Sequence, residues 1–578
     1  MFNVWYLAPH IDWHDHGDEK VIVSPLPPLK TQFAVFWIIL AASILGPLFA
    51  LVFGWGWWLP TLLMWVLLAM GLHDLRQTKH AIRRNYPIVG NMRYLLESIR
   101  PELRQYFFEN DKDDTPFSRS KRSLVYQRAK QELDKRPFGT EEDVYENRYE
   151  WINHSMQPVH PKSSDFRITV GGKDCRQPVD LSVLNISAMS FGALSANAVL
   201  ALNEGAKLGQ FAHDTGEGGI SEYHLRPGGD LIWNIGSGYF GCRDEEGNFN
   251  EEAFVANATR PEVRMIEIKL SQGAKPGHGG ILPGGKVTAE IAAARGVKMG
   301  QDCNSPAAHT AFNTPIGLLE FVARLRKLSG GKPVGFKLCI GHPWEWFAIA
   351  KAMTQSGIKP DFIVVDGAEG GTGAAPVEFI DHVGTPLREA LRLVHNTLVG
   401  LGIRDEVKIG ASGKIVSAFD MARTMALGAD WCNSARAFMF SIGCIQAQAC
   451  HTGRCPTGVA TQDPIRQKAL VVQDKAPRVA NYHRNTLGAL SELIGSAGLL
   501  HPRELRAHHI ALRLSASHVT LLSTVFPEFQ EGELNEGVLR TRVFKLGWPM
   551  ADPNSFTPQG SLTDMLAQID MSSNPVPG

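Results

Sequence analysis

The most distinct pattern along the chain is an apolar run near its start. From Phe33 to Leu72 there is no Asp, Glu, Lys, Arg or His, a stretch of 40 residues. Because one membrane-spanning helix needs about 20 apolar residues, the run predicts a hairpin with a first span over Phe33–Phe53 and a shorter second span over about Leu59–Leu72. A hairpin buried in a soluble core is the alternative. The run is too long and starts too late for a signal peptide.

Basic residues follow this hairpin, beginning with Arg76, Lys79, Arg83 and Arg84. Positive charge favours the cytoplasmic side of a membrane, and a hairpin returns both of its ends to one side. We therefore expect a cytoplasmic tail over 1–30, a transmembrane hairpin over 31–75 in the inner membrane of a bacterium, and a cytoplasmic catalytic domain.

A different pattern runs from about 180 to 440, where short apolar runs alternate with segments that have helical periodicity. The helical segments are Thr288–Arg295, Pro315–Leu328, Trp344–Ser356, Pro386–Leu401 and Ala418–Leu427. The strand-like runs are Val183–Ser187, Phe211–Thr215, Met265–Leu270, Val334–Ile340, Phe362–Asp366, Val407–Ala411 and Trp431–Ala435, with a weaker one near Gly300–Asn304. Eight alternations over roughly 260 residues predict an α/β fold, a (β/α)8 TIM barrel, with a doubly wound open sheet as the competitor. We place a helical connecting segment at 76–165, the barrel domain at 166–500 and a C-terminal extension at 501–578.

Composition and motifs argue against several classes of protein. The 58 Lys and Arg residues balance 58 Asp and Glu residues. We therefore do not expect a protein that binds nucleic acid through a basic surface. The eight cysteines are too few for a disulfide scaffold of 578 residues. No Gly-x-Gly-x-x-Gly follows any of these predicted strand-like runs, so no dinucleotide-binding domain is predicted.

Polar residues gather where the predicted strands end, which is where a barrel carries its active site. Glu267 and Lys269 alternate with apolar residues and therefore point to the same side of one strand. A lysine inside a barrel is costly unless it is paired or binds an anion. Lys269 is therefore an anion or cofactor ligand or an ion-pair partner of Glu267. Lys337 has the same two interpretations, and it could neutralise charge on a reduced flavin.

Three of the eight cysteines, Cys444, Cys450 and Cys455, fall within twelve residues just beyond the last strand. Their spacing is wider than zinc sites favour, and no fourth ligand is evident. Three soft sulfur donors suggest an iron–sulfur cluster, with unligated core thiols as the alternative.

The ordered motifs of this region resemble the synthase domain of glutamate synthase. They are Met189–Ser195 (MSFGALS), Gly216–Gly219 (GEGG), Glu267–Lys269 (EIK), Gln272–Gly277 (QGAKPG), Gly370–Ala374 (GGTGA) and Cys455–Gln462 (CPTGVATQ). The resemblance implies an oxidoreductase of the class that acts on CH–NH2 donors. It would carry FMN and a [3Fe-4S] cluster and reductively aminate 2-oxoglutarate, through 2-iminoglutarate, to L-glutamate.

The resemblance also implies roles for individual residues. It places Lys269, Gln272, Lys275, Arg295 and Glu217 in catalysis or substrate binding, with Glu217 near the entry point of ammonia. Ligands of the cluster would be Cys444, Cys450 and Cys455. The cofactor-binding residues it implies are Met189, Ser190, Lys337, Gly370, Gly371, Thr372, Gly373, Gly410, Ser412, Gly413 and Arg436.

Departures from the family leave the nitrogen donor open. No cysteine precedes Cys175, so we do not expect the amidotransferase domain of the large glutamate synthases, and we expect a membrane hairpin in its place. Ammonia, or an amidotransferase subunit on another chain, would supply nitrogen, and a ferredoxin or reductase subunit would supply electrons. The substrate would be 2-oxoglutarate or a similar keto acid. The alternatives are an N-methylglutamate synthase-like subunit and a membrane-bound electron-transfer subunit without amination activity.

Overall fold

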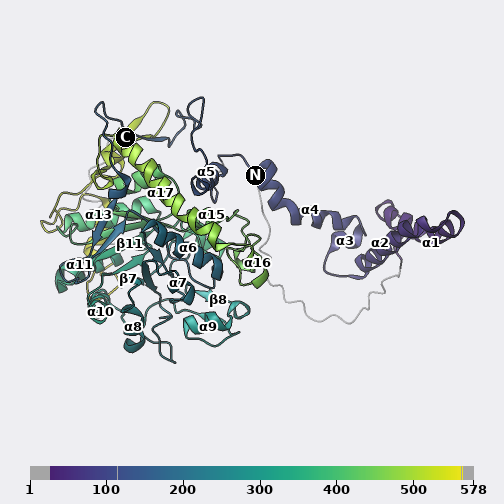
Figure 1. Ribbon diagram of the computed structural model, residues 1–578, viewed down its shortest axis with the longest axis horizontal. Helices are drawn as coiled ribbons and strands as arrows, with labels where there is room; N and C mark the ends of the chain where they lie inside the picture. Colours follow the sequence, from purple (N-terminus) through teal and green to yellow (C-terminus); the bar gives the residue numbers. More distant parts are fainter. Residues whose placement is uncertain (1–25, 113–114, 562, 564–578) are drawn as a thin grey trace. The chain divides into compact units, whose positions relative to one another are not determined.

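A computed structural model describes residues 26–112, 115–561 and 563, and Figure 1 shows its course. The chain divides into two compact units, residues 1–109 and residues 110–578. The predicted connecting segment 76–165 is shared between these units, and the predicted tail 1–30 lies mostly outside the described residues.

The first unit is built on a helical hairpin of α1 (Ala34–Phe53) and α2 (Trp58–Arg76). Both helices are long and apolar enough to cross a membrane, and most of their surface is not buried. The second helix extends further than the predicted Leu59–Leu72. Small and polar residues lie between the helices, where the Ser43 hydroxyl donates to the Met64 carbonyl at 3.1 Å and the Trp65 indole donates to the Ser43 carbonyl at 3.0 Å. Apolar side chains face outward, as in helices that pack in lipid.

Two further helices complete this unit, α3 (Ala81–Asn85) and α4 (Gly90–Leu103), and a π-helical turn, η3 (Arg104–Phe108), continues α4. The second unit begins before α5 (Arg119–Lys130), which packs against α17 (Val472–Ser496) and α15 (Arg436–Ser441).

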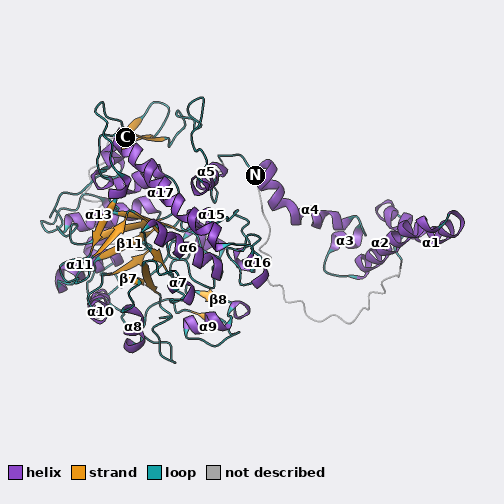
Figure 2. Ribbon diagram, viewed as in Figure 1, coloured by secondary structure: helices purple, strands orange, loops and turns teal. Residues whose placement is uncertain are grey.

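A closed barrel of eight parallel strands forms the centre of the second unit, with helices around it (Figure 2). This confirms the predicted α/β barrel. In chain order its strands are β4 (Leu184–Ile186), β5 (His213–Asp214), β6 (Leu231–Ile235), β7 (Val263–Lys269), β10 (Val334–Leu338), β11 (Phe362–Asp366), β12 (Lys408–Ser412) and β13 (Trp431–Ser434). The connecting helices are α6 (Ala196–Gly209), α7 (Glu222–Leu225), α8 (Glu251–Ala258), α9 (Ala289–Arg295), α10 (Pro315–Leu328), α11 (Pro343–Ser356), α12 (Val377–His382), α13 (Leu387–Gly400) and α14 (Ala418–Ala426).

One predicted strand is wrong. The run near Gly300–Asn304 contributes β9 (Cys303–Asn304), which pairs antiparallel with β8 (Ile281–Leu282) outside the barrel. The missing barrel strand is β6, whose sequence LIWNI carries an asparagine among its apolar residues. All five residues of β6 are buried, so the strand shows no alternation of polar and apolar positions.

Strand periodicity explains where the polar residues collect. Phe362 and Val364 of β11 pack inside the barrel. Asp366, two residues further along, points to the same side of the strand at its carboxyl end. The β2–β3 hairpin (Arg167–Val170 and Val179–Ser182) places Val170, Val179 and Leu181 against this inner apolar cluster. Apolar side chains therefore fill the lower barrel, and its carboxyl end is left for polar groups.

Segments that precede and follow the barrel strands in the chain pair in a small antiparallel sheet. It contains β1 (Glu150–Ile152), β14 (Ile510–Arg513) and β15 (Val519–Leu521). Two short helices follow β15, α18 (Leu522–Val525) and α19 (Arg542–Met550), and the Phe544 ring of α19 lies tilted against the Phe347 ring of α11, with 4.7 Å between the ring centroids. The described part of the region after 500 thus packs onto the barrel.

Candidate active site

A cavity of about 1130 Å³, including its open mouth, lies at the carboxyl ends of the barrel strands. Its walls come from the loops after six of the eight strands, from Asn234 and Lys337 within the other two, and from Phe117 of the segment before α5. Fourteen of the nineteen predicted site residues line it: Met189, Ser190, Glu217, Lys269, Gln272, Lys337, Gly370, Gly371, Thr372, Gly373, Ser412, Gly413, Arg436 and Cys450.

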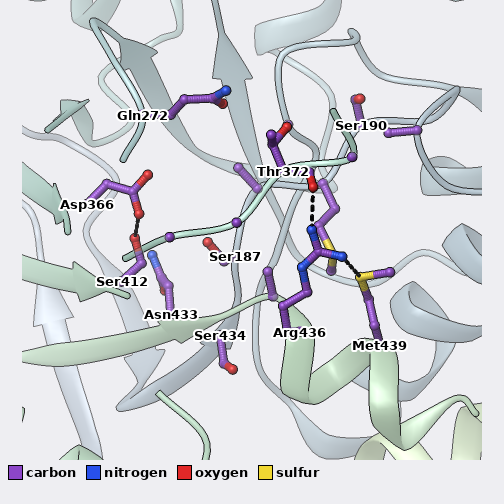
Figure 3. A pocket seen from close by; sticks show the side chains of 18 of the residues that line it. Ser187, Ser190, Gln272, Asp366, Thr372, Ser412, Asn433, Ser434, Arg436 and Met439 are labelled. Atoms are coloured by element: carbon purple, nitrogen blue, oxygen red, sulfur yellow. Dashed lines mark hydrogen bonds between the residues drawn. The ribbon is translucent and has the colours of Figure 1, made fainter. Parts of the chain in front are cut away.

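One wall of the cavity offers groups that suit an anion. The Arg436 guanidinium donates to the Thr372 carbonyl at 2.6 Å and so holds the Gly370–Gly373 loop over the start of α15 (Figure 3). In the part of the chain that the structure describes, no acceptor is found for the backbone N–H groups of Gly413, Lys414 and Ala435, which also line the cavity. Unpaired N–H groups beside a fixed cation favour a phosphate or a similar anion.

Gly410 does not belong to this wall. It lies within β12, where an added Cβ would come within 2.5 Å of the Trp431 ring. The glycine is required there because the buried indole crosses the strand.

A buried lysine sits at the floor of the cavity. The Lys337 ammonium lies 3.5 Å from the Asp366 carboxylate, which also accepts from the backbone N–H of Gly273 at 2.9 Å and from the Ser412 hydroxyl (Figure 3). Burial opposes the charge of Lys337, but Asp366, Glu267 and Asp214 outweigh it and raise the lysine pKa. Lys337 therefore stays protonated at the floor of the cavity.

Below that lysine, two carboxyl groups and an amide are buried together. Burial and the neighbouring Asp214 raise the pKa of Glu267 well above its usual range. This raised pKa favours the neutral form of Glu267, which accepts a hydrogen bond from the Asn234 amide of β6. Glu267 does not form the ion pair with Lys269 that was one interpretation of the sequence pattern.

Lys269 instead pairs with Glu217 from the loop after β5, with 2.9 Å between Nζ and Oε2. Burial raises the Glu217 pKa, but Lys269, Lys275 and Arg295 outweigh it, so the pKa is lowered overall. One ionised carboxylate thus lies among three cations. Lys275 and Arg295 do not line the cavity itself but lie behind its wall, where Lys275 donates to the Gly279 carbonyl at 3.3 Å and Arg295 donates to the Phe191 carbonyl at 3.3 Å.

The three clustered cysteines have different surroundings. Cys450 lines the cavity, and Cys444 and Cys455 are buried. Burial raises the pKa of the Cys444 thiol to about 11, and the proximity of Cys450 and Cys455 adds to this effect. Burial also opposes ionisation of Cys455, but backbone N–H groups of Ala460, Thr457 and Val459 outweigh it and lower the pKa of its thiol.

These sulfur atoms do not form a site for a single metal ion. Within residues 26–112, 115–561 and 563, no three or more His, Cys, Asp or Glu side chains are placed to hold one. Three neighbouring thiols, one of them stabilised as a thiolate by N–H groups, have the donor chemistry that a larger iron–sulfur group needs.

Sequence reasoning missed several cavity residues. Asn234 went unnoticed together with its strand, and Phe117 comes from a segment with no recognisable motif. Asp366 and Asn433 stand at strand ends that were predicted. Their position after an apolar run was the signal that could have identified them.

Comparison with known proteins places the chain in a family. The model of the conserved region in glutamate synthase matches residues 127–500. The chain belongs to this family. A glutamate synthase large subunit-like protein of Bacillus subtilis is 38% identical over 79% of this chain and 94% of that protein.

Other relatives match only in part. The archaeal glutamate synthase [NADPH] of Methanocaldococcus jannaschii is 38% identical over 57% of this chain and 61% of that protein. The glutamate synthase [NADPH] large chain of Bacillus subtilis is 33% identical over 56% of this chain and 21% of that protein. Among solved structures, a mandelate oxidase mutant aligns with 16% identity over 69% of this chain and 90% of that chain, at a TM-score of 0.37.

Proposed function

We propose that this glutamate synthase-like oxidoreductase uses FMN and a [3Fe-4S] cluster to convert 2-oxoglutarate and ammonia, through 2-iminoglutarate, into L-glutamate. The observation that carries the proposal is the arrangement of charge at the barrel mouth. An anion-binding wall lies in the same cavity as Glu217 and Lys269, with Lys275 and Arg295 behind them. Such a site suits one phosphorylated cofactor and one dicarboxylate substrate.

FMN would be held along the first wall and the floor. Gly413, Lys414 and Ala435 would offer backbone N–H groups to its phosphate, and Arg436 would add positive charge. Bound there, FMN would supply the hydride that reduces the imine carbon. The protonated Lys337 would stabilise negative charge at the floor of the cavity, because a buried cation interacts strongly in a medium of low polarity.

The substrate keto acid would bind at the cation cluster. Lys269 on the cavity wall can pair with one carboxylate, and Lys275 and Arg295 behind the wall add positive charge that favours a dicarboxylate there. The Gln272 side chain and the Ser190 hydroxyl make no hydrogen bond with any described residue, although both line the cavity. They are therefore available to the substrate.

Glu217 would receive the nitrogen. Its lowered pKa keeps it ionised, so it can accept hydrogen bonds from ammonia or bind ammonium before the carbonyl is attacked. Loss of water from the condensation product gives 2-iminoglutarate, and addition of a hydride and a proton gives L-glutamate.

Cys444, Cys450 and Cys455 would hold the cluster, which would supply single electrons from a ferredoxin or a reductase subunit. The hairpin α1–α2 would anchor the protein in the bacterial inner membrane, with the barrel on the cytoplasmic side. Its length and apolar composition support this anchor.

A product assay with a panel of nitrogen donors tests the proposal. The full-length protein in detergent, reduced with dithionite, receives 2-oxoglutarate with ammonium, methylamine or glutamine, and products are identified by mass spectrometry. Ammonium should give L-glutamate. N-methylglutamate as the only product would assign methylamine as the donor. No product from flavin-loaded and cluster-loaded protein would favour an electron-transfer subunit.

Lys269→Met extends the test to the substrate site. It should raise KM for 2-oxoglutarate at least tenfold, because Lys269 lies on the cavity wall 2.9 Å from Glu217. Lys207→Met is the matched control, since Lys207 donates to the Pro227 carbonyl at the exposed end of α6, away from the cavity lining. Equal KM values in the two variants would remove Lys269 from the substrate site.

A further inference from the structure

An apolar stripe runs along α4 and η3, in the unit that carries the hairpin. Met92, Leu95, Ile99, Leu103 and Phe107 recur at the three- and four-residue spacing that places side chains on one helix face. Met92 and Leu95 are each 59% exposed, and Phe107 is 77% exposed. A stripe of this size without cover is unusual for a helix of a soluble domain.

The other side of α4 is the one that packs. Tyr94 lies beneath the Arg83 guanidinium, 4.3 Å from its ring centroid, and its ring meets His80 at 5.0 Å. Contacts with α3 and the segment before it therefore hold Tyr94 inward and leave the stripe facing outward.

Packing also fixes where α4 begins. The buried Asp74 carboxylate, near the end of α2, accepts hydrogen bonds from the Ile88 backbone N–H at 2.9 Å and from the Asn91 amide. The Ile88 side chain packs over Gly71, and a Cβ added to Gly71 would lie 3.1 Å from that side chain. The stripe thus starts next to the end of the second membrane-length helix.

Charge in this segment suits an anionic surface. From Arg76 to Phe108 there are seven Lys or Arg residues and two acidic residues. Arg93, Arg100 and Arg104 follow one edge of the stripe, and the aromatic residues Tyr106, Phe107 and Phe108 stand at its end. Basic residues beside an apolar face with aromatic residues are typical of helices that lie in the membrane interface.

We propose that α4 and η3 lie in the plane of the membrane interface, with the apolar stripe at the acyl boundary and the flanking arginines toward anionic lipid headgroups. This rests on the proposed membrane anchor and adds a second lipid contact to it. The other candidates to cover the stripe are the barrel unit and a second copy of the chain.

Photo-crosslinking in vesicles distinguishes these cases. Benzoylphenylalanine is placed in the full-length protein at Leu95 or Phe107 on the stripe, at the exposed Glu97 on the opposite face of α4, and at the exposed Leu48 of α1. The proteins are reconstituted in vesicles of phosphatidylethanolamine and phosphatidylglycerol. We expect lipid adducts at Leu48, Leu95 and Phe107, with yields on the stripe several-fold above that at Glu97.

Two results would overturn the proposal. Adducts from Leu95 and Phe107 to the barrel or to a second chain would assign the stripe to a protein contact. Lipid yields on the stripe no higher than at Glu97 would leave it outside the interface. Leu48 separates this failure from failure of the anchor, because lipid labelling at Leu48 alone would keep the hairpin in the membrane and reject only the interfacial helix.

Discussion

Gly410→Ala is expected to destabilise the barrel without weakening cofactor binding. An added Cβ would lie 2.5 Å from two carbons of the Trp431 ring and 2.9 Å from its nitrogen, so the ring must move by nearly 1 Å. Trp431 is fully buried, and overpacking a buried site costs about 1–3 kcal/mol. The indole N–H also donates to Asn433 at 3.0 Å, and disturbing that bond adds about 1 kcal/mol. We expect a total of about 2–4 kcal/mol.

The assay is thermal unfolding of the detergent-solubilised protein, with flavin content measured per folded molecule. In a domain of this size, each kcal/mol lowers Tm by roughly 1–2 °C, extrapolating from smaller domains. Gly373→Ala is the matched control, since an added Cβ there meets nothing within 4 Å and the residue lines the cavity. It should leave Tm nearly unchanged. Wild-type stability of Gly410→Ala, or loss of flavin at an unchanged Tm, would refute the packing argument.

Three further changes test other parts of the site and the barrel. Arg436→Ala removes the hydrogen bond to Thr372 and a cation of the anion-binding wall, so the FMN Kd should rise at least tenfold in an equilibrium titration, and an unchanged Kd would reject that wall. Arg295→Lys keeps the charge but loses the guanidinium hydrogen bond to the Phe191 carbonyl, next to the cavity-lining Ser190, and KM for 2-oxoglutarate should rise about tenfold; an equal KM would show that charge alone suffices. A hydrogen bond from His395 lowers the Glu528 pKa to about 2. Its contribution to stability is therefore complete above pH 4.5 and is lost as pH falls toward 2. Glu528→Gln should cost on the order of 1 kcal/mol at pH 7, allowing for its partial exposure, and this difference in Tm should shrink in acid.

The sequence predicted the barrel because most of its strands are apolar runs that end at glycine or a polar residue. It failed at β6, where an internal asparagine and complete burial removed the alternation on which the prediction depends. The weak run chosen in its place is a short antiparallel strand outside the barrel. Its two residues adopt a strand conformation because they pair with β8, and 20 residues separate these two strands in the chain.

Local sequence patterns were also insufficient for individual site residues. Periodicity predicted that Lys269 points into the barrel, but its partner Glu217 is 52 residues away on another loop, and no local pattern could reveal that pairing. Gly410 looked like its neighbour Gly413, although the first lies under a tryptophan and the second lines the cavity. Local sequence indicated that glycine was needed, and only the fold shows what approaches it.

Flavin reoxidation in a single turnover tests the central claim most directly. The purified full-length protein is analysed for FMN, iron and sulfide, reduced anaerobically with dithionite, freed of excess reductant, and mixed with 2-oxoglutarate, ammonium or both. We predict bound FMN, about three irons per chain as expected for a three-iron cluster, and flavin reoxidation only when both substrates are present, with L-glutamate formed. Flavin that stays reduced with both substrates, or folded protein that contains neither flavin nor iron, would contradict the account.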